Sequence, residues 1–237
     1  MQIKKMTALL LAFVLSVTFA ACGSSQTVEN STDQTDNTTT TTDDSGKTAG
    51  SNPAKMAGSD NTLILYFSAN NSKDVDATSS ATPETDGMSS VEWIADIIHD
   101  RVGGDLVPII PSKDYPLSYN ELADYAKKER DDSSRPAFED LGVDPTGYDI
   151  VFIGYPIWWY EMPMMMDTFF ETYDLSGITI IPFNTHAGSR DGGTYGDIRE
   201  LEPNATVLDG LAISGSDAGK DSARTSVEEW LEGLDLD

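Results

Sequence analysis

The sequence predicts an α/β fold in which a doubly wound, five-stranded parallel sheet lies between two layers of helices. From residue 62 onward, short apolar segments alternate with segments of helical periodicity, which is the pattern of repeated βαβ units. The apolar segments are nearly continuous rather than alternating, as expected for strands that are buried on both faces. No internal repeat is visible, and the roughly 175 residues involved suit one domain.

Each strand and helix is predicted from its own local pattern. The strands are short apolar segments at residues 63–67, 105–110, 149–155 and 177–183, with a fifth marked by 206–208 and 211–213. The helices have apolar residues at helical spacing at residues 90–102, 117–130, from 163 onward, 193–201 and 222–234. Gly103-Gly104 ends the first helix, and Pro163 suits the first position of the third. On the second helix, Leu122, Tyr125 and Ala126 are expected to face inward.

Composition excludes several classes of function. The formal net charge is -25, which argues against nucleic acid as a partner and against electrostatic binding to anionic lipid, because both interactions need lysine and arginine. The chain has one cysteine and two histidines. It therefore forms no intrachain disulfide and no zinc cluster of cysteine and histidine, and we expect no metal site.

The N-terminus has the features of an export signal. Two lysines precede an apolar run at residues 6–21, which is shorter than the ~20 residues that a membrane span needs. The run ends in Ala20-Ala21-Cys22 and resembles the bacterial lipobox, although Phe19 stands where leucine is usual. This resemblance implies that residues 1–22 are a lipoprotein signal peptide and that Cys22 is lipidated, which would anchor the protein at the extracytoplasmic face of the cell membrane. The alternative is ordinary secretion with cleavage nearby.

Residues 23–61 differ in composition from the rest of the chain. They are rich in serine, threonine, aspartate, asparagine and glycine and contain no aromatic residue, so they cannot bury enough surface to offset their ordering entropy. We expect a disordered tether with a reach on the order of 35 Å. The folded domain is expected at 62–237.

Three loops are candidates for a functional site. In an open parallel sheet, ligands bind beyond the carboxyl ends of the strands, where the strand order reverses. The candidate residues are therefore those that follow the first, third and fourth strands, together with the start of the first helix. They are Ser68, Ala69, Asn70, Ser89, Ser90, Val91, Pro156, Ile157, Trp158, Trp159, Tyr160, Thr185, His186, Ala187, Gly188 and Ser189.

The adjacent tryptophans are the most specific feature of these loops. Successive strand residues point to opposite faces, so Trp158 and Trp159 cannot share one core pocket if the strand geometry persists. At least one ring is then expected to emerge at the ligand end of the sheet and to offer a flat surface to a flat ligand. The alternative is that both rings pack under the following methionine-rich helix.

The other two loops have alternative interpretations. The helix start at Ser89 and Ser90 is a potential anion site, because exposed N–H groups at a helix N-terminus bind anions; alternatively these serines only cap the helix. His186 lies at the end of a strand, where a functional role is possible, although a single histidine is more often structural. No catalytic residue is predicted. The sequence lacks G-x-G-x-x-G after a strand, G-x-x-x-x-G-K-[ST] and G-x-S-x-G, which disfavours dinucleotide binding, P-loop hydrolysis and esterase activity.

Four segments together resemble the flavodoxin-like family, in particular a branch carried on bacterial lipoproteins. They are "LILYFSA", "GYPIWWYEMP", "IIPFNTHAGSR" and "LEPNATVLDGLAIS", and the resemblance covers nearly all of 62–237. It implies the strand order 2-1-3-4-5, non-covalently bound FMN and the transfer of one or two electrons. The implied partner is a redox protein or a small electron acceptor.

The resemblance also implies roles for the candidate residues. Residues 68–70 and 89–91 would surround the phosphate, Trp158, Trp159 and Tyr160 would flank the isoalloxazine ring, and residues 185–189 would close its other side. The branch commonly has Gly-Asn-Thr where this chain has Ser89-Ser90-Val91, so a threonine hydroxyl is replaced by the valine. Two other functions stay open: an FMN-dependent NAD(P)H reductase of quinones or other small acceptors, and a non-redox binding module that has lost the flavin.

Overall fold

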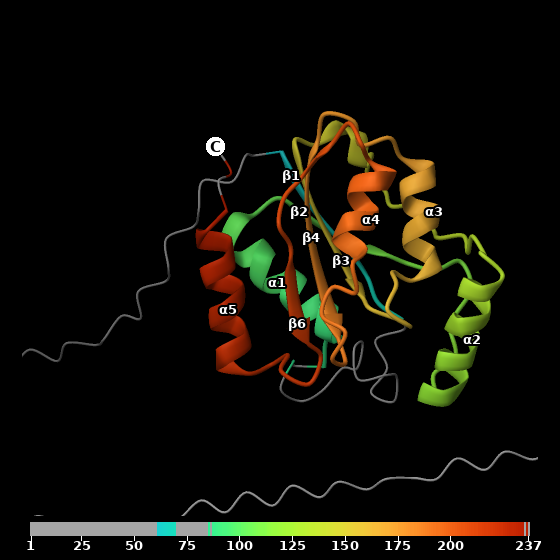
Figure 1. The fold of residues 1–237 in the computed structure, drawn as a ribbon. Helices are drawn as coiled ribbons and strands as arrows, with labels where there is room; N and C mark the ends of the chain where they lie inside the picture. Colours follow the sequence, from blue (N-terminus) through green and yellow to red (C-terminus); the bar gives the residue numbers. More distant parts are fainter. Residues whose placement is uncertain (1–60, 70–84, 86, 235, 237) are drawn as a thin grey trace, which may run out of the picture. The chain divides into compact units, whose positions relative to one another are not determined.

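The computed structural model describes residues 61–69, 85, 87–234 and 236. The predicted signal peptide, Cys22, the tether up to residue 60 and Asn70 lie outside the described residues. Within the described part, a central sheet is covered by helices on both faces (Figure 1). No helix among the described residues is long and apolar enough to cross a membrane.

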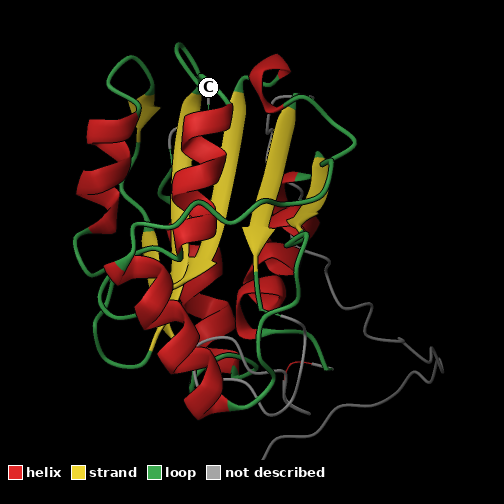
Figure 2. Cartoon of the chain, turned by 90° about the vertical axis from the view of Figure 1, so that its right-hand side faces the viewer, coloured by secondary structure: helices red, strands yellow, loops and turns green. Residues whose placement is uncertain are grey.

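The sheet has the predicted topology. Its strands are β1 (Thr62–Phe67), β2 (Asp105–Ile109), β3 (Ile150–Pro156), β4 (Thr179–His186) and β5 (Thr206–Val207), in the order β2-β1-β3-β4-β5. All pairings between neighbouring strands are parallel, and the strand arrowheads point toward the same end of the sheet (Figure 2). Strands β1 and β3 are buried along their whole length, as their continuous apolar sequences predicted. The predicted fold class is confirmed.

The fifth strand is interrupted, although residues 206–208 and 211–213 were predicted to form one strand. β5 ends at Val207, and a separate strand β6 (Leu211–Ser214) pairs with the remainder of β4. Leu208 N–H donates to Ile180 O, and Gly215 N–H donates to His186 O. Between these two hydrogen bonds, the chain segment that contains β6 is one residue longer than the facing segment of β4. The gap faces Pro182, which has no N–H to donate.

The helices divide the core into two apolar clusters. α1 (Ser90–Val102) and α5 (Asp221–Glu232) pack on one face of the sheet, whereas α2 (Tyr119–Asp131), α3 (Met164–Thr172) and α4 (Thr194–Leu201) pack on the other. Alternate residues of each strand belong to opposite clusters. Leu63 and Leu65 belong to the cluster beneath α2, α3 and α4, and Ile64 belongs to the cluster beneath α1 and α5. A short 3-10 turn, η2 (Pro145–Gly147), precedes β3.

Two boundaries differ from the prediction in a way that affects the site. β4 continues to His186, so Thr185 and His186 belong to the strand and not to the loop after it. The third helix begins at Met164, with Pro163 as its N-cap. The loops that leave the carboxyl ends of β3 and β4 therefore start at residues 157 and 187, and they emerge from adjacent parallel strands.

Candidate functional site

The loop after β3 forms a tight turn with two aromatic residues at its tip. Trp158 N–H donates to Glu161 O and Glu161 N–H donates to Trp158 O, both at 3.0 Å. The two central residues, Trp159 and Tyr160, have φ values of 54° and 69°. This left-handed conformation costs roughly 1–2 kcal/mol for a residue with a side chain and is normally taken by glycine or asparagine at a two-residue turn. Strain of this kind is concentrated at functional sites.

The two tryptophans have different environments. Trp158 is 8% exposed, and its ring packs edge-on against Phe67 and Tyr115 at centroid distances of 5.6 and 5.4 Å. Trp159 and Tyr160 are 43% and 71% exposed. One ring is therefore a core residue that borders the site, and the two rings at the turn are presented to solvent.

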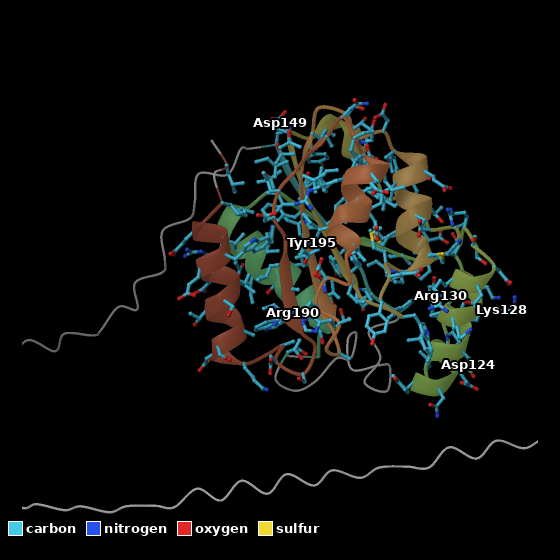
Figure 3. All side chains as sticks on the ribbon, in the orientation of Figure 1. Asp124, Lys128, Arg130, Asp149, Arg190 and Tyr195 are labelled. Carbon is cyan, nitrogen blue, oxygen red and sulfur yellow. The ribbon has the colours of Figure 1, made fainter. Side chains whose placement is uncertain are left out.

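α2 holds Trp159 in place. The indole N–H donates to the carbonyl oxygen of Ala123 at 2.9 Å, and the guanidinium of Arg130 lies 5.7 Å from the indole centroid, within range of a cation–π interaction. Figure 3 shows Arg130 on α2, together with Asp124 and Lys128. These contacts help to stabilise the left-handed turn and fix the position of its aromatic tip.

The loop after β4 is anchored by His186 and packs against the turn. Gly188 N–H donates to His186 Nδ1 at 3.0 Å, so the proton of the neutral imidazole is on Nε2. Burial, assisted by the nearby charge of Arg190, lowers the pKa of His186 and favours this neutral form. Gly192 packs so closely on the turn that a Cβ there would lie 2.5 Å from the carbonyl oxygen of Tyr160.

The two loops and α2 enclose a cavity of ≈550 Å³, which we call the aromatic slot. Its lining is mainly aromatic and aliphatic, with small residues on the side of the β4 loop. The lining residues are Tyr119, Leu122, Ala123, Ala126, Ile157, Trp158, Trp159, Tyr160, Ala187, Gly188 and Ser189. A flat apolar ligand can occupy such a slot while backbone groups of the loops bind its polar edge.

The start of α1 is capped by its own side chains. Ser89 Oγ accepts from Glu92 N–H at 3.1 Å, and Ser89 N–H donates to Glu92 Oε2 at 3.2 Å, which is a complete capping box. Val91 is fully buried in the apolar cluster beneath α1, so its side chain serves packing. Ser68, at the end of β1, has a buried Oγ without a hydrogen-bond partner among the described residues.

The structure brings together only part of the predicted site. Residues 157–160 and 187–189 line one cavity, whereas Ala69, Ser89, Ser90, Val91, Pro156 and Thr185 are buried outside its lining. The α2 residues of the lining were not among the predicted site residues. The inward orientation of Leu122 and Ala126 was predicted and is confirmed, but a helical pattern does not indicate which loop the helix will contact.

The fold and the slot define a doubly wound α/β protein with a cavity at the carboxyl ends of its strands. The family model for flavodoxin matches residues 62–234, and the chain therefore belongs to the flavodoxin family. Among solved structures, a protein from Bacteroides eggerthii provisionally classed as a flavoprotein is 28% identical, with a TM-score of 0.55 over 72% of this chain and 95% of that one. A similarly classed protein from Bacteroides uniformis is 27% identical, with a TM-score of 0.57 over 75% and 99%. No curated protein sequence matches the chain.

Acidic residues do not form a metal site in the described part of the chain. No group of three or more histidine, cysteine, aspartate or glutamate side chains is arranged there to hold a metal ion. The pKa of Asp167, which is half-buried, is raised by desolvation, and the pKa of Glu202, which is buried, is raised for the same reason. Glu202 accepts a backbone hydrogen bond from Leu175 at 3.2 Å, which gives it a structural role.

Proposed function

We propose that this protein binds FMN non-covalently and transfers electrons at the extracytoplasmic face of a bacterial membrane. The observation that carries the proposal is the aromatic slot at the carboxyl ends of β3 and β4, in a chain that belongs to the flavodoxin family. Bound FMN would supply one- and two-electron chemistry, while the chain supplies binding, orientation and exclusion of water. The alternative of a non-redox module predicts a colourless protein without affinity for flavin.

The residues present are compatible with FMN. Trp159, Tyr160 and the loop at 187–189 provide apolar and aromatic surface for the ring on two sides of the slot. The hydroxyl of Ser68, which has no hydrogen-bond partner among the described residues, lies at the end of β1, the strand that leads toward α1. A phosphate near the N-terminus of α1 would be favoured by the helix dipole, although the Glu92 carboxylate of the capping box would oppose it.

Trp159→Ala is expected to weaken FMN binding by about 1–3 kcal/mol, by analogy with the stacking of bases on aromatic side chains. Titration of the purified protein with FMN, followed by flavin fluorescence, measures the change. Trp230→Phe is the control, because Trp230 lies on α5 and contacts Phe152, and neither residue lines the slot. A wild-type protein that does not bind flavin contradicts the proposed function. Unchanged affinity in Trp159→Ala removes only this residue from the flavin site.

Cys22→Ala is expected to release the protein from the membrane, because we propose that this cysteine carries the lipid anchor. Expression in a bacterial host, followed by detergent partitioning and mass measurement, tests the expectation. Ser24→Ala is the matched control, since it alters a neighbouring residue and keeps the cysteine. A Cys22→Ala variant that stays with the membrane fraction as fully as the control would show that the anchor lies elsewhere.

A second candidate function is favoured by one observation. A cavity of ≈990 Å³ lies beside the aromatic slot, and both cavities are lined by Gly188. An FMN-dependent reductase needs room for a small molecule next to the flavin, and this cavity provides it. Turnover of NAD(P)H with a quinone by the FMN-loaded protein would distinguish a reductase from a simple electron carrier.

A further inference from the structure

Arg190 differs from the other basic residues. Among the lysines and arginines that the structure describes, every other one is in an ion pair or lies over an aromatic ring. The Arg190 guanidinium has neither kind of contact within that part of the chain. In a protein with a net charge of -25, acidic partners are abundant, so an arginine side chain left without one is a candidate for binding an external anion.

A buried polar network holds the backbone at Arg190. The residue has a φ of 56°, and its carbonyl oxygen accepts a hydrogen bond from Asn184 Nδ2 at 3.0 Å. Asn184 is completely buried, and its Oδ1 accepts from the hydroxyl of Tyr195. Tyr195 belongs to α4, and Figure 3 labels it together with Arg190.

A second set of buried hydrogen bonds holds the next residue along the loop. Thr194 Oγ1 donates to the carbonyl oxygen of Asp191 at 2.7 Å and is hydrogen-bonded to the hydroxyl of Tyr155 at 2.9 Å. Burial raises the pKa of the Tyr155 hydroxyl, which keeps it protonated. Satisfied buried networks specify a single conformation. These buried hydrogen bonds therefore fix the left-handed backbone conformation at Arg190.

The guanidinium borders the larger of the two cavities at this end of the sheet. This ≈990 Å³ cavity, which we call the edge cavity, lies along β6 between α4 and α5 and is lined by Arg190, His186 and Ser214, among others. His186 contributes an Nε2–H donor, because its Nδ1 accepts from Gly188. Ser214 contributes a hydroxyl that is hydrogen-bonded to Ser216 at 2.9 Å. Together with Arg190, these two side chains give the cavity hydrogen-bond donors for an acceptor ligand.

The acidic residues of the edge cavity already have partners. Asp209 pairs with Arg199 at 3.1 Å, and Asp217 pairs with Lys220 at 2.7 Å. The Asp191 carboxylate accepts from Gly193 N–H at 3.2 Å. Of the two arginines in the lining, Arg199 is ion-paired, whereas Arg190 has no ion pair within the described part of the chain.

We infer that the edge cavity binds the carboxylate or phosphate group of a small organic molecule, with Arg190 as the charged partner and His186 and Ser214 as further donors. Arginine is suited to this role because its planar guanidinium binds both anions in a bidentate manner. The cavity shares Gly188 with the aromatic slot, so the bound molecule would lie next to the flavin. Its role as a redox substrate rests on the proposed function, whereas its binding does not require flavin.

Matched ligand pairs test the inference on the full chain. Nicotinate and nicotinamide have nearly the same shape and differ by a negative charge, whereas phenyl phosphate differs from phenol by its anionic phosphoryl group. Calorimetric titration of the wild type is expected to show that at least one anion binds about tenfold or more tightly than its neutral counterpart. The two pairs distinguish a carboxylate site from a phosphate site. Arg190→Gln should reduce the preference to within about twofold, and Arg190→Lys should retain part of it.

Two controls show whether the preference for the anion arises at Arg190. Arg224→Gln removes a cation that lies over Trp93 outside the edge cavity, and it should leave the preference unchanged. The chain has two histidines, so the imidazole NMR signals of His186 can be followed with His99 as the internal reference. The preferred anion should shift the His186 signals, and it should do so less in Arg190→Gln.

The outcomes separate this inference from the proposed function, because the titrations are done with and without FMN. Anion preference that depends on Arg190 in a protein without affinity for FMN supports the inference and contradicts the proposed function. Equal affinity for the charged and neutral members of both pairs overturns the inference. A preference that survives in Arg190→Gln also overturns it, whether or not flavin binds.

Discussion

Gly154→Ala is expected to destabilise the domain by about 3 kcal/mol, which is the upper part of the usual range for overpacked cores. Gly154 lies within β3, and a Cβ at this position would be 2.2 Å from Cζ of Phe183. Phe183 is completely buried between the sheet and the helices α1 and α5. A flip of its ring leaves Cζ in place, so the strand or the ring must shift. Urea-induced unfolding measures the loss.

A double-mutant cycle shows whether Phe183 is the cause. Phe183→Leu removes the atoms that the new Cβ would meet, so the combined variant should be more stable than the sum of the two single changes predicts, by roughly 1–3 kcal/mol. Gly147→Ala is the control, because a Cβ there meets no atom within 4 Å. Additive effects of the two changes at 154 and 183 would mean that the destabilisation has another origin.

Gly192→Ala is expected to lower flavin affinity at least tenfold, which corresponds to about 1.4 kcal/mol. The residue has a φ of 64°, and its Cβ would lie 2.5 Å from the carbonyl oxygen of Tyr160. That oxygen belongs to the strained turn that carries Trp159 and Tyr160, so relief of the contact displaces the aromatic side of the slot. Titration of each variant with FMN, together with thermal unfolding, checks the expectation.

Gly193→Ala provides a closely matched control for that change. Gly193 has a φ of 93°, but a Cβ there meets no atom within 4 Å. Both variants should lose roughly 1–2 kcal/mol of stability because alanine is strained at positive φ, and only Gly192→Ala should also lose affinity. Equal losses of affinity in the two variants would show that loop strain, and not contact with the turn, controls the slot.

Much of the fold could be predicted because its signals are local. The bounds of α1 were predicted without error, since Ser89 before an apolar helical face and Gly103 after it are signals that act within a few residues. The interruption between β5 and β6 was not predicted. It coincides with the missing N–H of Pro182 on the neighbouring strand, and a pattern within 206–213 carries no information about that strand.

The environment of each site residue was harder to predict. The alternation of strand side chains indicated that Trp158 and Trp159 would separate, but it did not show that Trp159 would be the exposed ring. That outcome depends on the left-handed turn and on Ala123 and Arg130, which lie far away in the sequence. The buried hydrogen bonds that hold the loop at Arg190 likewise come from residues of β3, β4 and α4.

The class of fold and the parallel sheet followed from the sequence, because hydrophobic periodicity and turn residues act locally and repeat along the chain. Three features became visible only in the tertiary structure: α2 closes the aromatic slot, Val91 packs in the core, and Arg190 has no ion pair among the described residues. These features arise where segments distant in sequence meet, and each depends on packing and hydrogen bonds that no single segment encodes.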